Sequence, residues 1–230
     1  MISVNGKLKL SRSELARLID QTFLKPEATP ESIKELCRQA KQYGFAAVCV
    51  NPCYVETASN ELHDSPTSVC TVIGFPLGAS VPAIKAAEAA SAVRAGASEI
   101  DVVINVGYLK GGFFNKVLDD LEGVIKAARQ EKQNTVVKVI LETCLLSDRE
   151  KVEACRLATA VQANFVKTST GFSKSGATVS DVSLLKQTAG AGVEVKASGG
   201  IRNLTTAIAM VNAGASRLGT SSGISILNEI

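Results

Sequence analysis

Short apolar segments alternate with helical segments along the whole chain, and this alternation constrains the fold more than any other feature. Strict alternation implies parallel strands joined by right-handed crossovers, and eight such units close into a barrel with the helices outside. An open doubly wound sheet would usually carry a G-x-G-x-x-G turn, which the sequence lacks. We therefore predict a TIM (β/α)8 barrel, one domain over residues 1–230, with a short N-terminal helix at 11–19. The eight predicted strands are 19–26, 45–52, 68–78, 99–107, 136–144, 165–172, 193–201 and 216–224.

The composition argues against several classes of partner. Aromatic residues make up 4% of the chain, there is no Trp, and the formal net charge is +3. So few stacking side chains and so small a charge argue against nucleic acid, but are compatible with a small anionic substrate. No apolar run is long enough to cross a bilayer, and the N-terminal segment lacks the apolar core of a signal peptide. We expect a cytoplasmic protein with no membrane partner.

Cysteine and histidine are too sparse for the common metal sites. The six Cys form no C-x-x-C pair, and Cys49 and Cys53 have no second ligand pair to complete a zinc site. His63 is the single histidine and lies in a polar stretch, so a multi-histidine site cannot be built. A Ser–His–Asp triad would depend on this one surface residue. We expect no metal, no cofactor and no disulfide.

Three lysines interrupt the apolar strand segments. Lys138, Lys167 and Lys196 follow one another at intervals of 29 residues, about the length of one strand–helix unit. We therefore expect the three amines at similar heights on successive strands. The alternative is that each amine reaches solvent at a strand end. However, lysine is seldom buried without a partner or a task. Asp101 interrupts an earlier apolar strand in the same way.

Burial and a second positive charge nearby both favour the neutral form of an amine. A neutral amine can attack a carbonyl and form a Schiff base. Asp101 and the remaining ammonium groups would then move protons. This chemistry suits cleavage of carbon–carbon bonds. Sequence physics alone does not say which lysine is the nucleophile.

The loops after the seventh and eighth strands favour an anion. In TIM barrels ligands bind at the C-terminal ends of the strands, and phosphate is often held after the last two. Gly199 and Gly200 lie in the first of these loops, and Gly219, Ser221 and Ser222 lie in the second, before a helix. A helix N-terminus attracts anions. The alternative is that these are ordinary turn and capping residues.

Eight motifs in the chain resemble those of the deoxyribose-phosphate aldolases, class I aldolases on a TIM barrel. They are DQTFLKPEAT, VCVNPCYV, VIGFPLGA, EIDVVINVG, KVILETCLL, FVKTSTGF, VKASGGIR and GASRLGTSSG, and they span nearly the whole chain. The resemblance implies reversible cleavage of 2-deoxy-D-ribose 5-phosphate to acetaldehyde and D-glyceraldehyde 3-phosphate, in deoxyribonucleotide catabolism. It also implies a homodimer or homotetramer.

The resemblance also implies roles for single residues. Lys167 would form the Schiff base. Lys196 would favour the neutral form of Lys167 and relay protons, and Asp101 would shuttle protons. Gly171 would join the five phosphate-loop residues named above. Four further residues align with positions near the substrate: Thr22, Cys49, Lys138 and Thr168. For Cys49, plain packing within the strand is an equal alternative. Gln21 stands where the family usually shows His, which leaves the hydrogen bonding around this strand open.

Three other functions remain open from the sequence. The chain could be a Schiff-base aldolase for a different phosphorylated sugar. It could be a phosphate-binding barrel that has lost catalysis, although a mere binder has no need of paired buried lysines. A metal-dependent aldolase is disfavoured by the single histidine.

Overall fold

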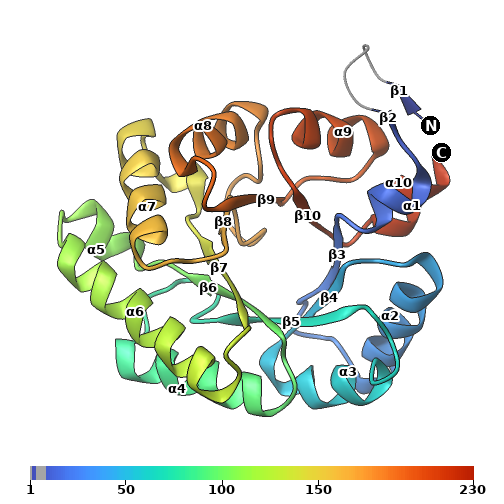
Figure 1. The fold of residues 1–230 in the computed structure, drawn as a ribbon, viewed down its shortest axis with the longest axis horizontal. Coiled ribbons are helices and arrows are strands. Elements are labelled where there is room, and N and C mark those ends of the chain that lie inside the picture. The colour runs from blue at the N-terminus through green and yellow to red at the C-terminus, as the bar shows by residue number, and fades with distance from the viewer. Residues whose placement is uncertain (1, 4–8) are drawn as a thin grey trace.

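The computed structural model describes residues 2–3 and 9–230, and its centre is a closed barrel of eight parallel strands. Figure 1 shows this ring from one end, with the helices outside it. The last strand, β10, pairs in parallel with the first barrel strand, β3, and so closes the ring. The predicted TIM barrel is confirmed. In order around the barrel the strands are β3 (Ile19–Phe23), β4 (Ala47–Val50), β5 (Ser68–Ile73), β6 (Glu99–Val103), β7 (Val136–Ile140), β8 (Phe165–Lys167), β9 (Glu194–Ser198) and β10 (Arg217–Thr220).

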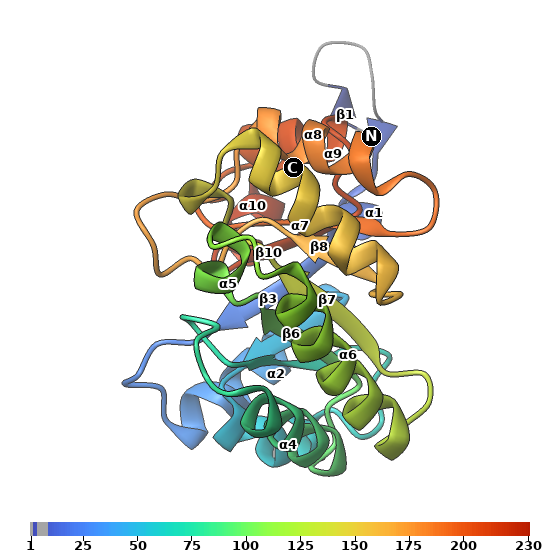
Figure 2. The same cartoon turned by 90° about the vertical axis from the view of Figure 1, so that its left-hand side faces the viewer.

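Helices follow the strands and form the outer wall, where α4, α6 and α7 lie side by side (Figures 1 and 2). None of the described helices combines the length and apolarity needed to cross a bilayer. The strands β1 (Ile2–Ser3) and β2 (Lys9–Leu10) form a separate antiparallel pair before the barrel. The helices are α1 (Arg12–Ala16), α2 (Pro30–Tyr43), α3 (Val55–Glu61), α4 (Pro82–Arg94), α5 (Val106–Lys110), α6 (Phe114–Glu131), α7 (Asp148–Ala160), α8 (Val179–Ala189), α9 (Leu204–Asn212) and α10 (Gly223–Asn228), with 3-10 turns η1 (Pro52–Tyr54) and η2 (Thr143–Leu145).

Capping residues set several helix boundaries. The side chain of Thr29 accepts the backbone N–H of Ser32 before α2, Pro30 occupies the first turn, and Gly44 ends the helix in the left-handed conformation, with a φ of 70°. The predicted N-terminal helix is α1, and Ser11 forms a capping box at its start.

All eight barrel strands end earlier than the sequence predicted, and three of them show how the chain turns at the barrel mouth. The segment 99–107 leaves the sheet after Val103, because the side chain of Asn105 accepts the N–H of Tyr108 and starts the unpredicted helix α5. The segment 136–144 ends at Ile140, and 165–172 ends at Lys167. The apolar runs continue past the sheet because the loops that follow are also buried.

The barrel strands present two different faces, since side chains alternate along a strand. Outward residues such as Val48, Ile100 and Val139 join the large apolar core beneath the helices. Inward residues form a smaller apolar cluster that includes Cys49 and Cys70. The charged strand residues also point inward, and they build the site described next.

The two ends of the described chain lie close together beside the barrel (Figure 1). Helices α1 and α10 contact each other, and Arg12 Nη2 donates to Asn228 Oδ1 at 3.0 Å. This contact lies next to the seam where β10 pairs with β3.

Candidate active site

Seven charged side chains meet inside the barrel, although strand interiors are usually apolar. Six are at most 4% exposed and the seventh, Arg217, is partly buried. Counted as formal charges, four cations face three carboxylates. The seven are Lys138, Lys167, Lys196, Arg217, Asp20, Glu99 and Asp101, and ion pairs link all of them.

Asp101 is the common acceptor at the centre of this cluster. Its Oδ2 accepts from Lys167 Nζ at 2.8 Å and from Lys196 Nζ at 2.8 Å, and its Oδ1 accepts from Lys138 Nζ at 2.8 Å. Burial alone would raise the pKa of this carboxyl, but the three ammonium groups outweigh it and hold the pKa well below its usual range. Asp101 therefore stays ionised.

Lys167 and Lys196 are direct partners in the β8–β9 register. On the other side of β8, Lys138 pairs with Phe165, two residues before Lys167. Barrel strands are tilted and staggered, so register partners do not lie at equal heights along the barrel axis. All three ammonium groups donate to the carboxylate of Asp101, so the three amines lie together inside the barrel, as their equal spacing predicted.

Two of the three lysines are held in the charged form. Burial favours a neutral amine at Lys196, but Asp101 and Asp20 outweigh it and raise its pKa above the usual value. At Lys138, burial would likewise lower the pKa, but the nearby acidic groups, Asp101 above all, outweigh burial and raise it. Burial would raise the pKa of Asp20, but the nearby cations, Lys196 above all, outweigh it and lower the pKa from 3.8 to about 2.

A cavity of about 240 Å³ opens above the cluster at the C-terminal ends of β3, β8, β9 and β10. Lys167 is the one lysine of the charged cluster on its wall. The other predicted site residues on its wall are Thr22, Gly171, Gly199, Gly200, Gly219 and Ser221.

The remaining predicted residues do not line this cavity. Asp101, Lys196, Lys138 and Cys49 are fully buried. Thr168 is also buried, and its hydroxyl donates to the carbonyl of Ser198 at 3.1 Å and accepts the N–H of Ser198 at 3.0 Å, so it cross-links two loops.

The cavity wall offers backbone N–H groups to an anion. Those of Gly171, Gly200 and Ser221 have no protein acceptor within the part of the chain that the structure describes. Ser222 lies off the wall, and its N–H donates to Thr220 Oγ1 at 2.9 Å. The exposed Lys25, which sequence reasoning missed, also lines the cavity. This arrangement suits a phosphate.

Gln21 holds the second of these loops from the outer face of the barrel. Its Nε2 donates to the carbonyl of Ser221 at 3.4 Å, and its Oε1 accepts the N–H of Gly223 at 3.1 Å. The hydroxyl of Thr22 donates to the Asp20 carbonyl instead. Gln21 therefore bonds to the loop before α10 rather than to the side chains of its neighbours.

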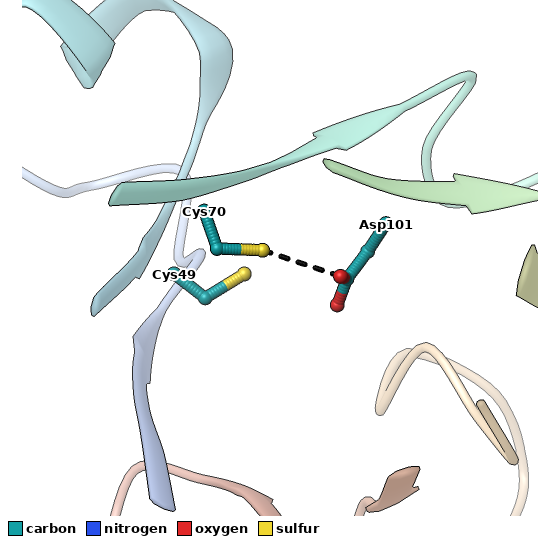
Figure 3. Close-up of side chains that lie close together, drawn as sticks. All are labelled: Cys49, Cys70 and Asp101. Carbon is teal, nitrogen blue, oxygen red and sulfur yellow. Dashed lines mark hydrogen bonds between the residues drawn. The ribbon is translucent and has the colours of Figure 1, made fainter. Parts of the chain in front are cut away.

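Cys49, Cys70 and Asp101 lie close enough together to resemble a metal site (Figure 3). The Cys70 thiol donates to Asp101 Oδ1 at 3.2 Å, and burial followed by the Cys49 contact raises the pKa of Cys70 well above its usual value. The carboxylate oxygens also accept from three ammonium groups. A protonated thiol among ammonium groups is a poor cation ligand, so this donor set does not fit a metal.

Sequence reasoning missed three members of the charged cluster: Asp20, Glu99 and Arg217. Asp20 interrupts an apolar strand, as the lysines do, whereas Glu99 and Arg217 are the first residues of β6 and β10. Glu99 also precedes Asp101 by two residues, so both must face the same side of the sheet. This alternation was the signal that could have placed them.

Comparison with known proteins identifies the family of this site. The model of the DeoC/LacD family aldolases matches residues 15–229. The chain belongs to the DeoC/LacD family of aldolases. This result confirms the enzyme class that the eight motifs predicted.

Individual members of the DeoC/LacD family are similar over nearly their whole length. The deoxyribose-phosphate aldolase of Carboxydothermus hydrogenoformans is 55% identical over 96% of this chain and 97% of its own. That of Enterococcus faecalis is 52% identical over 94% of this chain and 96% of its own. The tetrameric deoxyribose phosphate aldolase of Aeropyrum pernix is similar in structure, with a TM-score of 0.89 and 37% identity, covering 95% of this chain and 92% of that one.

Proposed function

We propose that this chain is a class I aldolase that reversibly cleaves 2-deoxy-D-ribose 5-phosphate into acetaldehyde and D-glyceraldehyde 3-phosphate, with Lys167 as the Schiff-base lysine. One observation carries the proposal: Lys167 reaches the cavity wall while its amine shares an Asp101 oxygen with Lys196. The two similar curated relatives bear the name of this activity.

The charge balance supports Lys167 as the nucleophile. Four cations and three carboxylates leave one positive charge in excess in a buried interior, which is costly. Lys138 and Lys196 are held charged by their carboxylates, and an arginine does not lose its proton. Lys167 is the remaining lysine of the cluster and the one that reaches the cavity wall, so it is the amine placed to attack a substrate.

The reaction follows from these positions. The neutral amine of Lys167 adds to the C1 aldehyde of the open-chain sugar. The resulting carbinolamine hydroxyl takes up a proton and leaves as water, which gives an iminium ion. Asp101 and Lys196 relay the proton that leaves the C3 hydroxyl. The C2–C3 bond then breaks, its electrons move to the iminium nitrogen, and glyceraldehyde 3-phosphate leaves. The remaining enamine is protonated at C2, and water releases acetaldehyde and the free amine.

The loops at the cavity mouth would hold the 5-phosphate. We propose Gly171, Gly200 and Ser221 as the donors of this subsite, supported by the free N–H groups described above, with Gly199, Gly219 and Ser222 as residues that shape the same loops. Gly219 also has a steric role: a Cβ there would lie 3.1 Å from Lys196 Cε. The iminium ion itself is the electron sink, so the mechanism requires no resident cofactor.

The same proposal includes the setting of the enzyme. We propose a cytoplasmic protein of one domain that acts in deoxyribonucleotide catabolism. We also propose a homodimer or homotetramer, an assembly supported by the tetramer of the Aeropyrum pernix relative.

Borohydride reduction in the presence of acetaldehyde tests the nucleophile. Reduction should fix a two-carbon adduct on Lys167, detected by peptide mass spectrometry, and Lys167→Leu should abolish it. An adduct on Lys196 alone would reverse the assigned roles. Product analysis with 2-deoxyribose 5-phosphate tests the substrate, since an aldolase for another sugar would form the adduct but release no glyceraldehyde 3-phosphate.

A further inference from the structure

Glu142 has an unusual backbone and a buried carboxylate at the edge of the site. It follows β7, its side chain is 4% exposed, and its φ of 56° and ψ of 61° are left-handed. This backbone conformation is strained for any residue other than Gly. Residues with strained backbones cluster at functional sites. The mechanism above gives Glu142 no part.

The carboxylate of Glu142 holds Thr170, in the loop that follows the Schiff-base lysine. The N–H of Thr170 donates to both carboxylate oxygens, at 3.3 and 3.4 Å, and its hydroxyl donates to Oε2. The same hydroxyl accepts the N–H of Phe172 at 3.0 Å. Within residues 170–172, only the N–H of Gly171 then lacks an acceptor in the part of the chain that the structure describes.

Packing alone does not hold this loop. Thr170 and Phe172 line the cavity of about 240 Å³ on one side and a second cavity of about 130 Å³ on the other. A Cβ added at Gly171 would meet nothing within 4 Å. The ring of Phe172 meets that of Phe75 edge to face, with centroids 5.2 Å apart, but Phe172 is still 53% exposed. The hydrogen bonds to Glu142 therefore supply the fixed end of this loop.

We propose that Glu142 is a positioning residue that holds the loop 170–172 so that the Gly171 N–H points at the substrate's phosphate. This inference rests on the proposed function for the identity of the substrate. Because Glu142 accepts the Thr170 N–H, the Gly171 N–H is the single amide of this loop left to bind the anion. The backbone strain at Glu142 is the cost of aiming its carboxylate at Thr170.

The chemistry requires a carboxylate rather than an amide. Thr170 presents two donors to Glu142, and an ionised carboxylate is purely an acceptor. In Glu142→Gln an N–H₂ group would face one of these donors. Glu142→Gly would relieve the left-handed strain and remove both acceptors, which separates backbone shape from hydrogen bonding. Glu122→Gln, on the exposed face of α6, is the matched control.

Binding of inorganic phosphate is the direct test, because it needs no sugar chemistry. In ¹⁵N-labelled protein, titration with phosphate should shift the Gly171 amide resonance in the wild type and in Glu122→Gln. Both Glu142 variants should weaken phosphate binding by about 10-fold to about 100-fold, the range for a lost hydrogen bond to a charged group. Wild-type affinity in both variants would overturn the inference.

Kinetics separate positioning from a general structural role. The KM for 2-deoxyribose 5-phosphate should rise in both Glu142 variants. In contrast, kcat/KM for unphosphorylated 2-deoxyribose and borohydride trapping of acetaldehyde should stay at the wild-type level. Equal losses in all these measurements would show that Glu142 only supports the fold, and would overturn the inference. If wild-type protein binds phosphate through Gly171 but does not cleave the sugar, the proposed function fails while the role of Glu142 stands.

Discussion

Lys167 and Lys196 face each other from adjacent strands in register and donate to one oxygen, Asp101 Oδ2, each at 2.8 Å. The carboxylate therefore couples the proton on one amine to the charge on the other. Any change to the cluster should alter how readily Lys167 gives up its proton. The first two predictions follow from this coupling.

Lys138→Met should shift the activity profile towards alkaline pH. The variant leaves three cations and three carboxylates, and loss of a neighbouring positive charge favours the protonated form of an amine. We expect kcat/KM for cleavage to fall about 10-fold to about 100-fold at pH 7 and to recover partly near pH 9, as for a general base or nucleophile that needs deprotonation. Lys126→Met, at an exposed position on α6, serves as the control. A uniform loss at every pH would contradict the charge-balance argument.

Asp101→Asn should destabilise the fold, because three ammonium groups lose their shared acceptor. Removing one partner of a buried ionic network costs about 3–5 kcal/mol. Adding Lys138→Met should restore part of this loss, since it removes one uncompensated charge. Urea unfolding of the two single variants and the double variant measures the coupling. Additive losses would mean that the residues stabilise the barrel independently.

Asp20 should contribute to stability in a defined acid range. Its pKa is lowered from 3.8 to about 2, so the folded state binds its proton less readily than the unfolded state does. The contribution is complete above pH 3.8 and is lost as the pH falls towards 2. Asp20→Asn should be less stable at neutral pH and should lose less stability across this range. Guanidinium unfolding between pH 2 and pH 5 checks the slope, with the exposed Asp119→Asn expected to behave as the wild type.

Gln21→Ala should weaken phosphate binding without affecting the Schiff base. The amide of Gln21 holds the Ser221 carbonyl and the Gly223 N–H, and the variant frees both. We expect KM for the phosphorylated sugar to rise by about 10-fold, the effect of losing one or two neutral hydrogen bonds. Trapping of acetaldehyde by borohydride should be unchanged. A loss of trapping would place Gln21 in the support of β3 rather than of the loop.

The sequence could predict the barrel because each strand–helix unit carries local signals. Alternation within a strand also predicts which residues face inward, and Glu99 and Asp101 were readable in this way. Register was not readable, because the stagger between neighbouring strands depends on closure of the whole ring. Lys138 shows this limit: its spacing to Lys167 equals that from Lys167 to Lys196, but its register partner on β8 is Phe165.

The site loops were predicted less well than the strands. Gly171, Gly199 and Gly200 were identifiable because glycine in such loops permits positive φ, and all three have it. Glu142 gave no such signal, since nothing in KVILETC indicates a left-handed glutamate. Its role depends on Thr170, which is 28 residues away and meets it only in the folded barrel.

The seam between β10 and β3 has a consequence for synthesis. Asp20, on the first barrel strand, pairs with Lys196 and Arg217 on the last two. A ribosome that releases the chain from its N-terminus must therefore expose the acid long before its basic partners emerge. The ion pairs at this seam can therefore form only after the last two strands have been made.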